Sequence, residues 1–168
     1  PIYYQQASLI LTQCKSANYN PTFFGCDGLD GILSIKNFDT SLCEGVMLLT
    51  PFAADAQDQA TQDFVKKYKD AYKGETPNQF AADAYDGVMV LAELMKKEGI
   101  TADMSASDIC DKLKKAITDK DFSYDGLTGT GMKWGEDGAV SKDPKAVIIK
   151  NGAYSALTAD DIAASTAQ

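Results

Sequence analysis

The chain has 168 residues, of which 45% are hydrophobic and 24% charged, an ordinary composition for a globular protein with a buried core. Its formal net charge of -8 argues against a nucleic-acid-binding surface, because such binding depends on clustered cations. All 16 basic residues are lysines and histidine is absent, which removes arginine forks and imidazole bases and so disfavours much enzyme chemistry.

Three further features bear on membrane insertion, processing and disulfide formation. No apolar run approaches the roughly 18 residues of a membrane span. The sequence begins at Pro1 without a methionine or a signal peptide, so we expect a processed or truncated product. Cysteines stand at Cys14, Cys26, Cys43 and Cys110, with no CxxC spacing. Two disulfides are compatible with this count, but we favour small buried thiols.

Two strands and two helical segments are predicted in the first 50 residues. Apolar residues at helical spacing predict a helix over residues 4–17, and Thr22–Gly25 reads as a short buried strand. A weaker helical pattern follows from about Leu29 to Lys36. The apolar run 46–49 lies between Gly45 and Pro51 and predicts a parallel strand covered on both faces. Strands separated by helices indicate an open α/β sheet.

Three helices with little strand between them are expected next. The first ends at Gly74, and the third begins near Ser105. The second has a capping-box pattern, with Thr76 as cap, Pro77 at the first helical position and Gln79 closing the box. The apolar stripe predicted to be buried on this second helix is Ala81, Ala84, Tyr85, Val88, Leu91, Ala92 and Met95.

The remaining sequence reads as rich in β-structure. Leu127, Met132 and Trp134 surround a glycine-rich stretch, and residues 146–149 form another apolar run. Asn151-Gly152 predicts a tight turn, and the tail from Thr158 reads as a final helix or a frayed end. Only about three apolar runs qualify as buried strands, too few for the helices present, which favours a truncated domain over a complete one.

Three motif-like patterns fail on inspection. Asp121-x-Ser123-x-Asp125-Gly126 resembles the front of a calcium loop, but Met132 stands where a bidentate glutamate is required. Gly129-Thr130-Gly131 follows a helix and precedes a strand, the wrong context for a dinucleotide loop. The lysines at 112–115 fit a solvated helix face. We therefore predict no catalytic residue, no metal site and no cofactor.

Two features could bind a ligand. Tyr3-Tyr4 stands directly before a helix, where a preceding strand would end, and Asp27 follows the next strand. Ligands of open α/β sheets bind at the carboxyl ends of strands, and a carboxylate with an aromatic hydroxyl suits an ammonium group. The alternative is that Asp27 is a helix-capping or turn residue and that the tyrosines belong to the core.

At these residues the sequence resembles the type I periplasmic binding proteins that serve branched-chain amino acid ABC transporters. The matching segments, in order, are Pro1–Tyr4, Gln13–Ala17, Phe24–Gly28, Glu44–Val46, Thr50–Phe52, Phe64–Tyr68, Pro77–Asp86, Phe122, Asp125–Gly129 and Asp137-Gly138. The resemblance covers residues 1 to about 154, and its most specific part is Pro77–Asp86.

The resemblance implies a three-layer αβα fold with two flavodoxin-like lobes in a protein about twice this long, of which this chain is the incomplete C-terminal portion. Residues 1–50 and 143–168 would belong to the second lobe. Residues 51–142 would supply first-lobe helices and the crossover, with Thr50-Pro51-Phe52 as a hinge.

Carried over residue by residue, the resemblance makes Tyr3 the aromatic lining of an amino-acid pocket and Asp27 the partner of the ligand ammonium. Phe80 would be an apolar contact near the cleft mouth. Asp27 is a glutamate in some relatives, and the first-lobe residues that hold the ligand carboxylate are absent from this chain.

The expected function is the substrate-binding component of an ABC transporter, which binds a branched-chain or similar amino acid outside the cytoplasm, in the periplasm or lipid-anchored at the cell surface. Its partners would be the permease subunits and the missing N-terminal half, with self-association of the isolated piece and no nucleic acid. One alternative is a receptor domain that senses an amide, urea or aromatic acid. A small hydrolytic enzyme is the other, and the absence of histidine and arginine disfavours it.

Overall fold

The computed structural model describes residues 2–166, which form two compact units. The first, here called the sheet unit, comprises the residues up to Gln79 together with those from Pro144 onward. The second, here called the helical unit, is Phe80–Asp143. The chain therefore leaves the sheet unit once and returns to it, so residues far apart in the sequence share one sheet.

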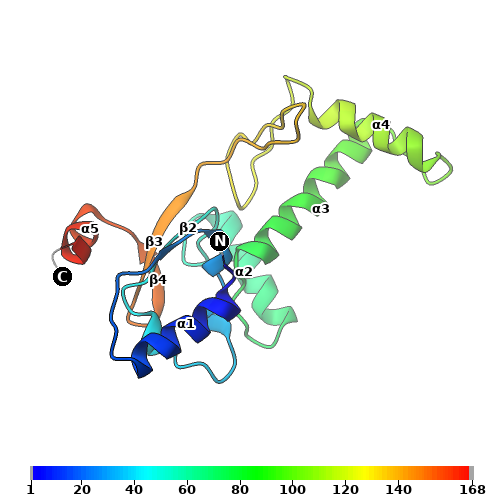
Figure 1. The fold of residues 1–168 in the computed structure, drawn as a ribbon. Helices are drawn as coiled ribbons and strands as arrows, with labels where there is room; N and C mark the ends of the chain where they lie inside the picture. Colours follow the sequence, from blue (N-terminus) through cyan, green and yellow to red (C-terminus); the bar gives the residue numbers. More distant parts are fainter. Residues whose placement is uncertain (1, 167–168) are drawn as a thin grey trace. The chain divides into compact units, whose positions relative to one another are not determined.

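The sheet unit is built on a four-stranded sheet in the order β1-β2-β3-β4 (Figure 1). β1 (Phe24–Gly25) is parallel to β2 (Met47–Thr50), whereas β3 (Lys145–Lys150) is antiparallel to both β2 and β4 (Ala153–Ala156). Asn151 and Gly152 join β3 to β4 with φ values of 52° and 73°. The tight turn predicted at this dipeptide is confirmed, because such positive φ angles favour asparagine and glycine.

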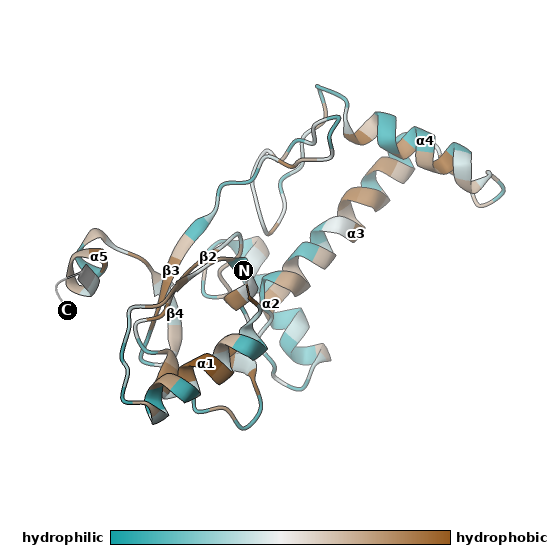
Figure 2. Cartoon of the chain, viewed as in Figure 1, coloured by the Kyte–Doolittle hydropathy of each residue, from teal (hydrophilic) through white to brown (hydrophobic). Residues whose placement is uncertain are grey.

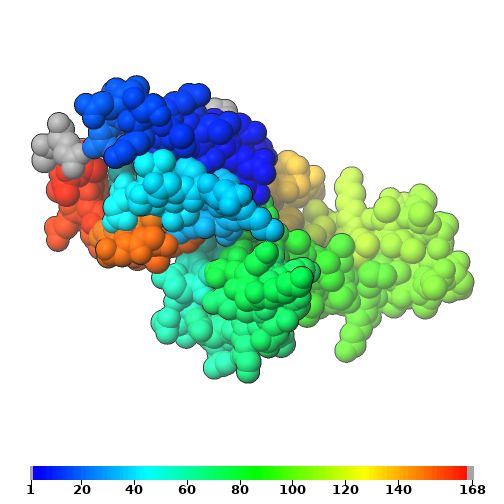
Figure 3. Space-filling model, turned by 90° about the horizontal axis from the view of Figure 1, so that it is seen from below, coloured from blue at the N-terminus to red at the C-terminus, as the bar shows by residue number. Residues whose placement is uncertain are grey.

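The main core lies between α1 (Tyr4–Ser16), the sheet and a series of three 3-10 turns. Buried side chains from these elements form one cluster: Ala7, Leu11, Leu29, Ile32, Cys43, Val46, Leu48, Val147 and Ile149. The turns η1 (Asp27–Leu29), η2 (Ile32–Ser34) and η3 (Thr40–Cys43) lie against α1, and Figure 3 shows this segment beside α1 on one face. They replace the weak helix predicted over Leu29–Lys36, where Leu29 ends the 3-10 turn η1 and Ile32–Ser34 forms the 3-10 turn η2.

β2 is covered on both faces, as its uninterrupted apolar sequence predicted. Met47, Leu48 and Thr50 are 4%, 0% and 4% exposed, although their side chains alternate between the two faces of the sheet. After β2, Phe52 packs edge-on against Phe64 with ring centroids 5.9 Å apart, which fixes α2 (Gln59–Ala71) in the sheet unit. The side chain of Asp58 caps α2 by accepting from the amide of Thr61 at 2.9 Å.

The helical unit contains α3 (Gln79–Lys97) from its second residue onward, α4 (Ala106–Ile117) and the glycine-rich segment after them. Its core joins Val90 and Leu94 of α3 to Ala116 of α4 and to Phe122. α4 begins next to Ser105 as predicted, and Ser105 caps it, since its hydroxyl accepts from the amide of Asp108 at 3.1 Å.

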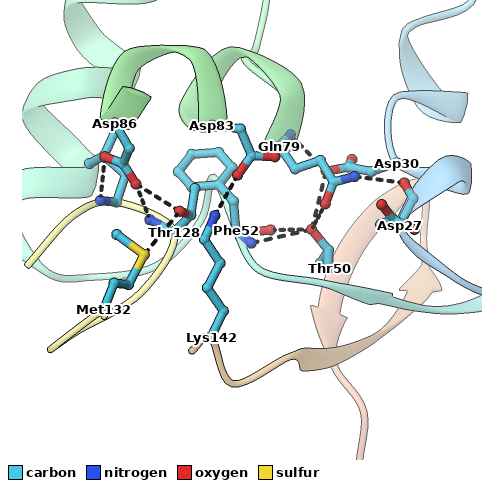
Figure 4. A network of polar contacts seen from close by, with 11 residues as sticks. Asp27, Asp30, Thr50, Phe52, Gln79, Asp83, Asp86, Thr128, Met132 and Lys142 are labelled. Carbon is cyan, nitrogen blue, oxygen red and sulfur yellow. Dashed lines mark hydrogen bonds and ion pairs between the residues drawn. The ribbon is translucent and has the colours of Figure 1, made fainter. Parts of the chain in front are cut away.

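A buried carboxylate organises the loop of the helical unit. Asp86 is 4% exposed, and it accepts from the amides of Leu127 and Thr128 at 2.9 and 2.8 Å and from the Thr128 hydroxyl at 2.7 Å (Figure 4). A Cβ atom at Gly126 would lie 2.5 Å from this carboxylate, so the loop can approach only because residue 126 is glycine. The β-rich region predicted here is reduced to two isolated bridges, Tyr124–Met132 and Trp134–Val140.

The face that α3 buries in this structure differs from the predicted one. The buried positions after its first residue, spaced by four, are Ala82, Asp86, Val90 and Leu94. The predicted stripe is largely exposed, including Tyr85 at 39%, Val88 at 66%, Leu91 at 45% and Met95 at 40%, and Figure 2 shows apolar residues along the length of α3. The helix therefore carries a second, more apolar face that the described residues do not bury.

The start of α3 also differs from the prediction. The helix begins at Gln79, not at Pro77, and the carboxylate of Asp30 accepts from the Gln79 amide at 2.8 Å. Gly99 lies just beyond the end of α3 with a φ of 59°, and the Ile100 amide donates to the carbonyl of Met95.

All four cysteines are free thiols, which decides between the two possibilities that the sequence left open. They are not uniformly buried as we favoured: Cys43 is buried and Cys14 is half-buried, but Cys26 and Cys110 are exposed. Burial raises the pKa of the Cys43 thiol to about 11, so this thiol stays protonated at neutral pH. The tail predicted as a helix or frayed end forms α5 (Ala159–Thr166).

Candidate functional site

Tyr3 is placed by the start of α1. It is the residue that precedes the helix, in extended conformation with φ -90° and ψ 160°, and its side chain does not cap the helix. Its side chain is 65% exposed, so the alternative that this tyrosine belongs to the core is wrong. That alternative holds for Tyr4 instead, which packs against the main core cluster.

Asp27 follows β1 as predicted and opens the 3-10 turn η1. Its carbonyl oxygen accepts from the Asp30 amide at 3.0 Å, which closes the turn. Of the alternative stated from the sequence, the capping role is not supported, because η1 has no side-chain cap, but Asp27 is a turn residue. The Asp27 carboxylate is exposed and makes no hydrogen bond or ion pair with the residues that the structure describes. It is therefore open to an external cation.

Tyr3 and Asp27 line the same pocket of the sheet unit, which has a volume of about 590 Å³. Apart from Asp27, Tyr3 and Cys26, its lining residues are apolar or glycine, and they lie in or next to α1, β1, η1, η2 and the start of β2. Gly28 permits this assembly: a Cβ atom there would lie 2.6 Å from the carbonyl oxygen of Ile2, just before Tyr3. The glycine thus lets η1 and the start of α1 approach closely enough to share one pocket.

A larger pocket of the sheet unit, about 720 Å³, lies where β1 and β2 begin. Pro21, Thr22 and Gly45 line it together with Lys150 and Asp161. It contains neither Tyr3 nor Asp27, and it lies at the amino ends of the parallel strands, whereas ligands of such sheets bind at the carboxyl ends. The smaller pocket is therefore the better candidate site.

The third predicted contact, Phe80, belongs to the other unit. It lies in the first turn of α3, is 36% exposed and does not line the pocket of Tyr3 and Asp27 within the sheet unit. Its contact with a ligand side chain stays a prediction.

Behind Asp27 lies a buried polar network that was not predicted from the sequence (Figure 4). Asp30, Thr50 and Gln79 are 4%, 4% and 1% exposed. The Asp30 carboxylate accepts from the main-chain amide of Gln79 at 2.8 Å. The Thr50 hydroxyl lies 3.3 Å from both Asp30 Oδ2 and Gln79 Oε1. The same hydroxyl is 3.0 Å from the Phe52 carbonyl, and its single hydrogen can serve only one of these acceptors at a time.

Tyr154 of β4 completes the network. Its hydroxyl accepts from the Gly31 amide at 3.2 Å and donates to the Asp30 carboxylate. Burial raises the pKa of Asp30 above its usual value, against the opposing effect of the hydrogen bonds from Gln79, Tyr154, Gly31 and Thr50. Burial, and next the negative charge of Asp30, raise the pKa of Tyr154 as well.

The sequence carried one weak signal for this network. Asp30 stands in an otherwise apolar run, Leu29-Asp30-Gly31-Ile32-Leu33, and a charged residue that is buried in such surroundings needs hydrogen-bond or ion-pair partners. Gln79 was assigned to a local capping box, and nothing in the sequence links it to Asp27 or Asp30.

The comparison with family models decides the identity of the fold. The model described as periplasmic binding protein matches residues 2–153 of this chain. The chain belongs to the periplasmic binding protein family. No curated protein matches the sequence. The resemblance stated from the sequence alone is thereby confirmed at the level of the family.

Solved structures agree on the fold of this periplasmic binding protein. The leucine-binding protein LivK of Thermotoga maritima is 23% identical with a TM-score of 0.69, over 95% of this chain and 44% of that one. LivJ of Streptococcus pneumoniae, a branched-chain amino acid transporter substrate-binding protein solved with isoleucine, is 23% identical with a TM-score of 0.72, over 92% and 41%. A substrate-binding protein of Desulfitobacterium hafniense in complex with leucine is 20% identical with a TM-score of 0.64, over 90% and 40%.

The α/β fold of type I periplasmic binding proteins is therefore confirmed, and this chain spans less than half the length of the structures it matches. Among residues 2–166, no helix is both long and apolar enough to cross a membrane. Nor do the residues in this range bring together three or more histidine, cysteine or acidic side chains as a metal would require.

Proposed function

We propose that this chain is the later part of an extracytoplasmic substrate-binding protein of an ABC transporter, and that it binds the ammonium group of a branched-chain or similar amino acid. The supporting observation is the pocket that Tyr3 and Asp27 both line among mostly apolar residues, together with the exposure of Asp27, whose carboxylate has no partner among the described residues. An amino acid with an apolar side chain has both complements, a cation and a hydrocarbon group.

The energetics require more than this pocket. Burying a leucine-sized side chain contributes about 1.5–3 kcal/mol, whereas micromolar affinity needs about 8.2 kcal/mol. Most of the binding energy must then come from the charged groups of the ligand in a closed, dry cleft. We propose that Asp27 and Tyr3 take the ammonium and that a lobe outside this chain takes the carboxylate.

Two surfaces support a missing lobe. β1 pairs with β2 alone among the described strands, and Phe24 on this strand is 60% exposed beside the apolar pocket. We propose that a parallel strand of the complete protein adds to this edge and fills the part of the pocket along β1, which leaves the end at Tyr3 and Asp27 for the ligand. The exposed stripe of α3 would pack on the same missing portion.

The division into lobes follows from this proposal. Residues 1–50 and 143–168 would form part of the second lobe, and residues 51–142 would supply helices and the crossover to the first. Closure of the two lobes on the ligand would present a surface to the permease subunits in the membrane. The protein would act by binding and delivery, without catalysis and without a cofactor.

The test is the substitution Asp27→Ala in the complete protein, with calorimetric titration of L-leucine and L-isoleucine. We expect an affinity loss of about a hundredfold or more, because the ligand ammonium would lose its charged partner. Asp70→Ala, which removes an exposed aspartate of α2, is the matched control and should bind as the unaltered protein does.

A ligand without the ammonium, 4-methylpentanoate, distinguishes the roles further. Its weak binding should be unaffected by Asp27→Ala, because it has no positive charge to lose. If the affinity for leucine and isoleucine survives the substitution, the ammonium assignment is wrong. A thermal-shift screen of amides, ureas and aromatic acids would then test the receptor alternative.

A further inference from the structure

The second carboxylate of the loop after β1 has a different environment from Asp27. Asp30 is 4% exposed and makes no ion pair with any lysine in the part of the chain that the structure describes. Hydrogen-bond donors surround it instead, among them the Gln79 amide at 2.8 Å and the Tyr154 hydroxyl. A buried charge stabilised only by dipoles fixes the groups that donate to it, because each lost donor leaves part of the charge unsatisfied.

Gln79 is the group that links this fixed point to Asp27. It is 1% exposed, and its side-chain amide donates from Nε2 to the carbonyl oxygen of Asp27 at 2.9 Å (Figure 4). The other end of the same amide, Oε1, lies 3.3 Å from the Thr50 hydroxyl. The main chain of Gln79 is held by Asp30 and its side chain holds Asp27, so the two aspartates are connected through a single residue.

We propose that Gln79, held by Asp30, is a positioning residue that fixes Asp27 for contact with the ligand ammonium. The inference rests on the proposed function, since it assigns the support of the same site. Within η1 itself, Asp27 is held only by the hydrogen bond that its carbonyl oxygen accepts from the main-chain amide of Asp30, three residues later, at 3.0 Å. A turn of three residues leaves the direction of the first side chain weakly defined, and the bond from Gln79 fixes that carbonyl from outside the turn.

The arrangement separates two tasks between two aspartates. The carboxylate of Asp27 is exposed and has no partner among the described residues, as a ligand contact requires. No hydrogen bond from these residues to that carboxylate therefore fixes its direction. Asp30 and Gln79 are almost completely buried, and both make hydrogen bonds within the protein. A binding group is effective only when its support holds it within about 0.5 Å of the productive position, which is the task that this pair performs.

The test begins with Gln79→Met in the complete protein, which removes the amide but preserves the length of the side chain and the main-chain bond to Asp30. We expect hydrogen exchange at the amides of Leu29 and Asp30 to accelerate. We also expect the affinity for L-isoleucine to fall by about threefold to tenfold, the effect of one neutral hydrogen bond. Gln13→Met, at an exposed glutamine of α1, is the control and should change neither quantity.

A double-mutant cycle separates positioning from a general loss of stability. If Gln79 acts through Asp27, then Gln79→Met should weaken isoleucine binding in the unaltered protein but have no further effect in an Asp27→Ala background. Equal effects in both backgrounds would overturn the inference, because they would show that Gln79 acts independently of Asp27.

The exchange measurement keeps the inference apart from the proposed function. Unchanged exchange at Leu29 and Asp30 in Gln79→Met would overturn the inference whatever the ligand is. Isoleucine binding that is insensitive to Asp27→Ala would overturn the proposed function, and with it the claim that Gln79 positions a ligand contact. If Gln79→Met does not fold, Gln79→Asn serves instead, because its amide is polar but one methylene too short to reach Asp27, and the same outcomes apply.

Discussion

The stability of the loop that contains Leu127 and Thr128 should depend on the carboxylate of Asp86 more than on any contact at the surface of the helical unit. Asp86→Ala would leave the amides of Leu127 and Thr128 and the Thr128 hydroxyl without their acceptor. Each hydrogen bond to a charged group is worth about 1.5–3 kcal/mol, so three bonds set an upper limit near 9 kcal/mol. Relief from burying the charge and entry of water reduce this, and we expect a loss of about 3–5 kcal/mol in the free energy of unfolding.

Urea unfolding of the complete protein, followed by circular dichroism, measures this loss. Asp83→Ala is the control on the same helix, because Asp83 pairs with Lys142 at 2.8 Å while its side chain is 39% exposed. It should cost at most about 1 kcal/mol. A second check uses Gly126, where an added Cβ would meet the Asp86 carboxylate at 2.5 Å. Gly126→Ala should be strongly destabilising in the unaltered protein and much less so beside Asp86→Ala. A loss below about 1 kcal/mol for Asp86→Ala would refute the reasoning.

Three other predictions concern the sheet unit and the exposed faces. In Gly28→Ala the new Cβ would lie 2.6 Å from the Ile2 carbonyl oxygen, so η1 should move away and amino-acid binding should weaken. The control is Gly87→Ala, which has open space around it; this variant should bind normally and gain about 0.5–1 kcal/mol of stability. Hydrogen bonds from Lys150 and Thr158 lower the pKa of Asp161 from 3.8 to about 2. The stabilising effect of the Asp161 carboxylate should therefore be complete above about pH 4 and be lost as the pH falls toward 2. An NMR titration of Lys150→Met should show the pKa of Asp161 rising toward 3.8. The isolated 168-residue chain should self-associate through its exposed apolar faces, and a monodisperse monomer in light scattering would contradict this.

Local signals were sufficient for the elements whose stabilisation is local. The start of α4 next to Ser105 and the β3–β4 turn at Asn151-Gly152 follow from side-chain and backbone preferences that act within a few residues. The two-sided burial of β2 follows from its uninterrupted apolar run. In each case the sequence pattern and the structural cause involve the same few residues, so the prediction did not depend on the rest of the fold.

The face of α3 could not be predicted in this way because the helix carries two stripes. The one with the larger side chains, including Val88 and Leu91, is the better candidate for a core, yet the structure buries Val90 and Leu94 instead. Helical periodicity shows that a face is apolar but not which neighbour covers it. If the complete protein covers the second stripe, as we propose, both faces of α3 are core faces and the sequence pattern has no single answer.

In the candidate site, too, some residues follow from local sequence signals and others only from the fold. Tyr3 and Asp27 were located from the positions of a helix start and a strand end, and the structure places both in one pocket. Whether they bind a ligand is untested. Asp30 and Gln79 are 49 positions apart in the chain, and only the fold brings them together, so no local pattern could have shown their bond. Gln79 was assigned to the cap of its own helix, whereas the structure assigns that task to Asp30.

The charge of the pocket constrains what the remainder of the protein must supply. Asp27 lines the pocket and the buried carboxylate of Asp30 lies three positions further along, while no lysine is among the lining residues and the chain has no arginine. The negative charge of Asp27, with no cation among the lining residues, favours an ammonium and disfavours a carboxylate in the same place. A ligand that carries both groups must therefore turn its carboxylate away from this pocket. The donors for that group, amides or hydroxyls on a facing surface, are what the complete protein has to provide, and a protein that binds a simple amine as tightly as leucine would show that no such surface exists.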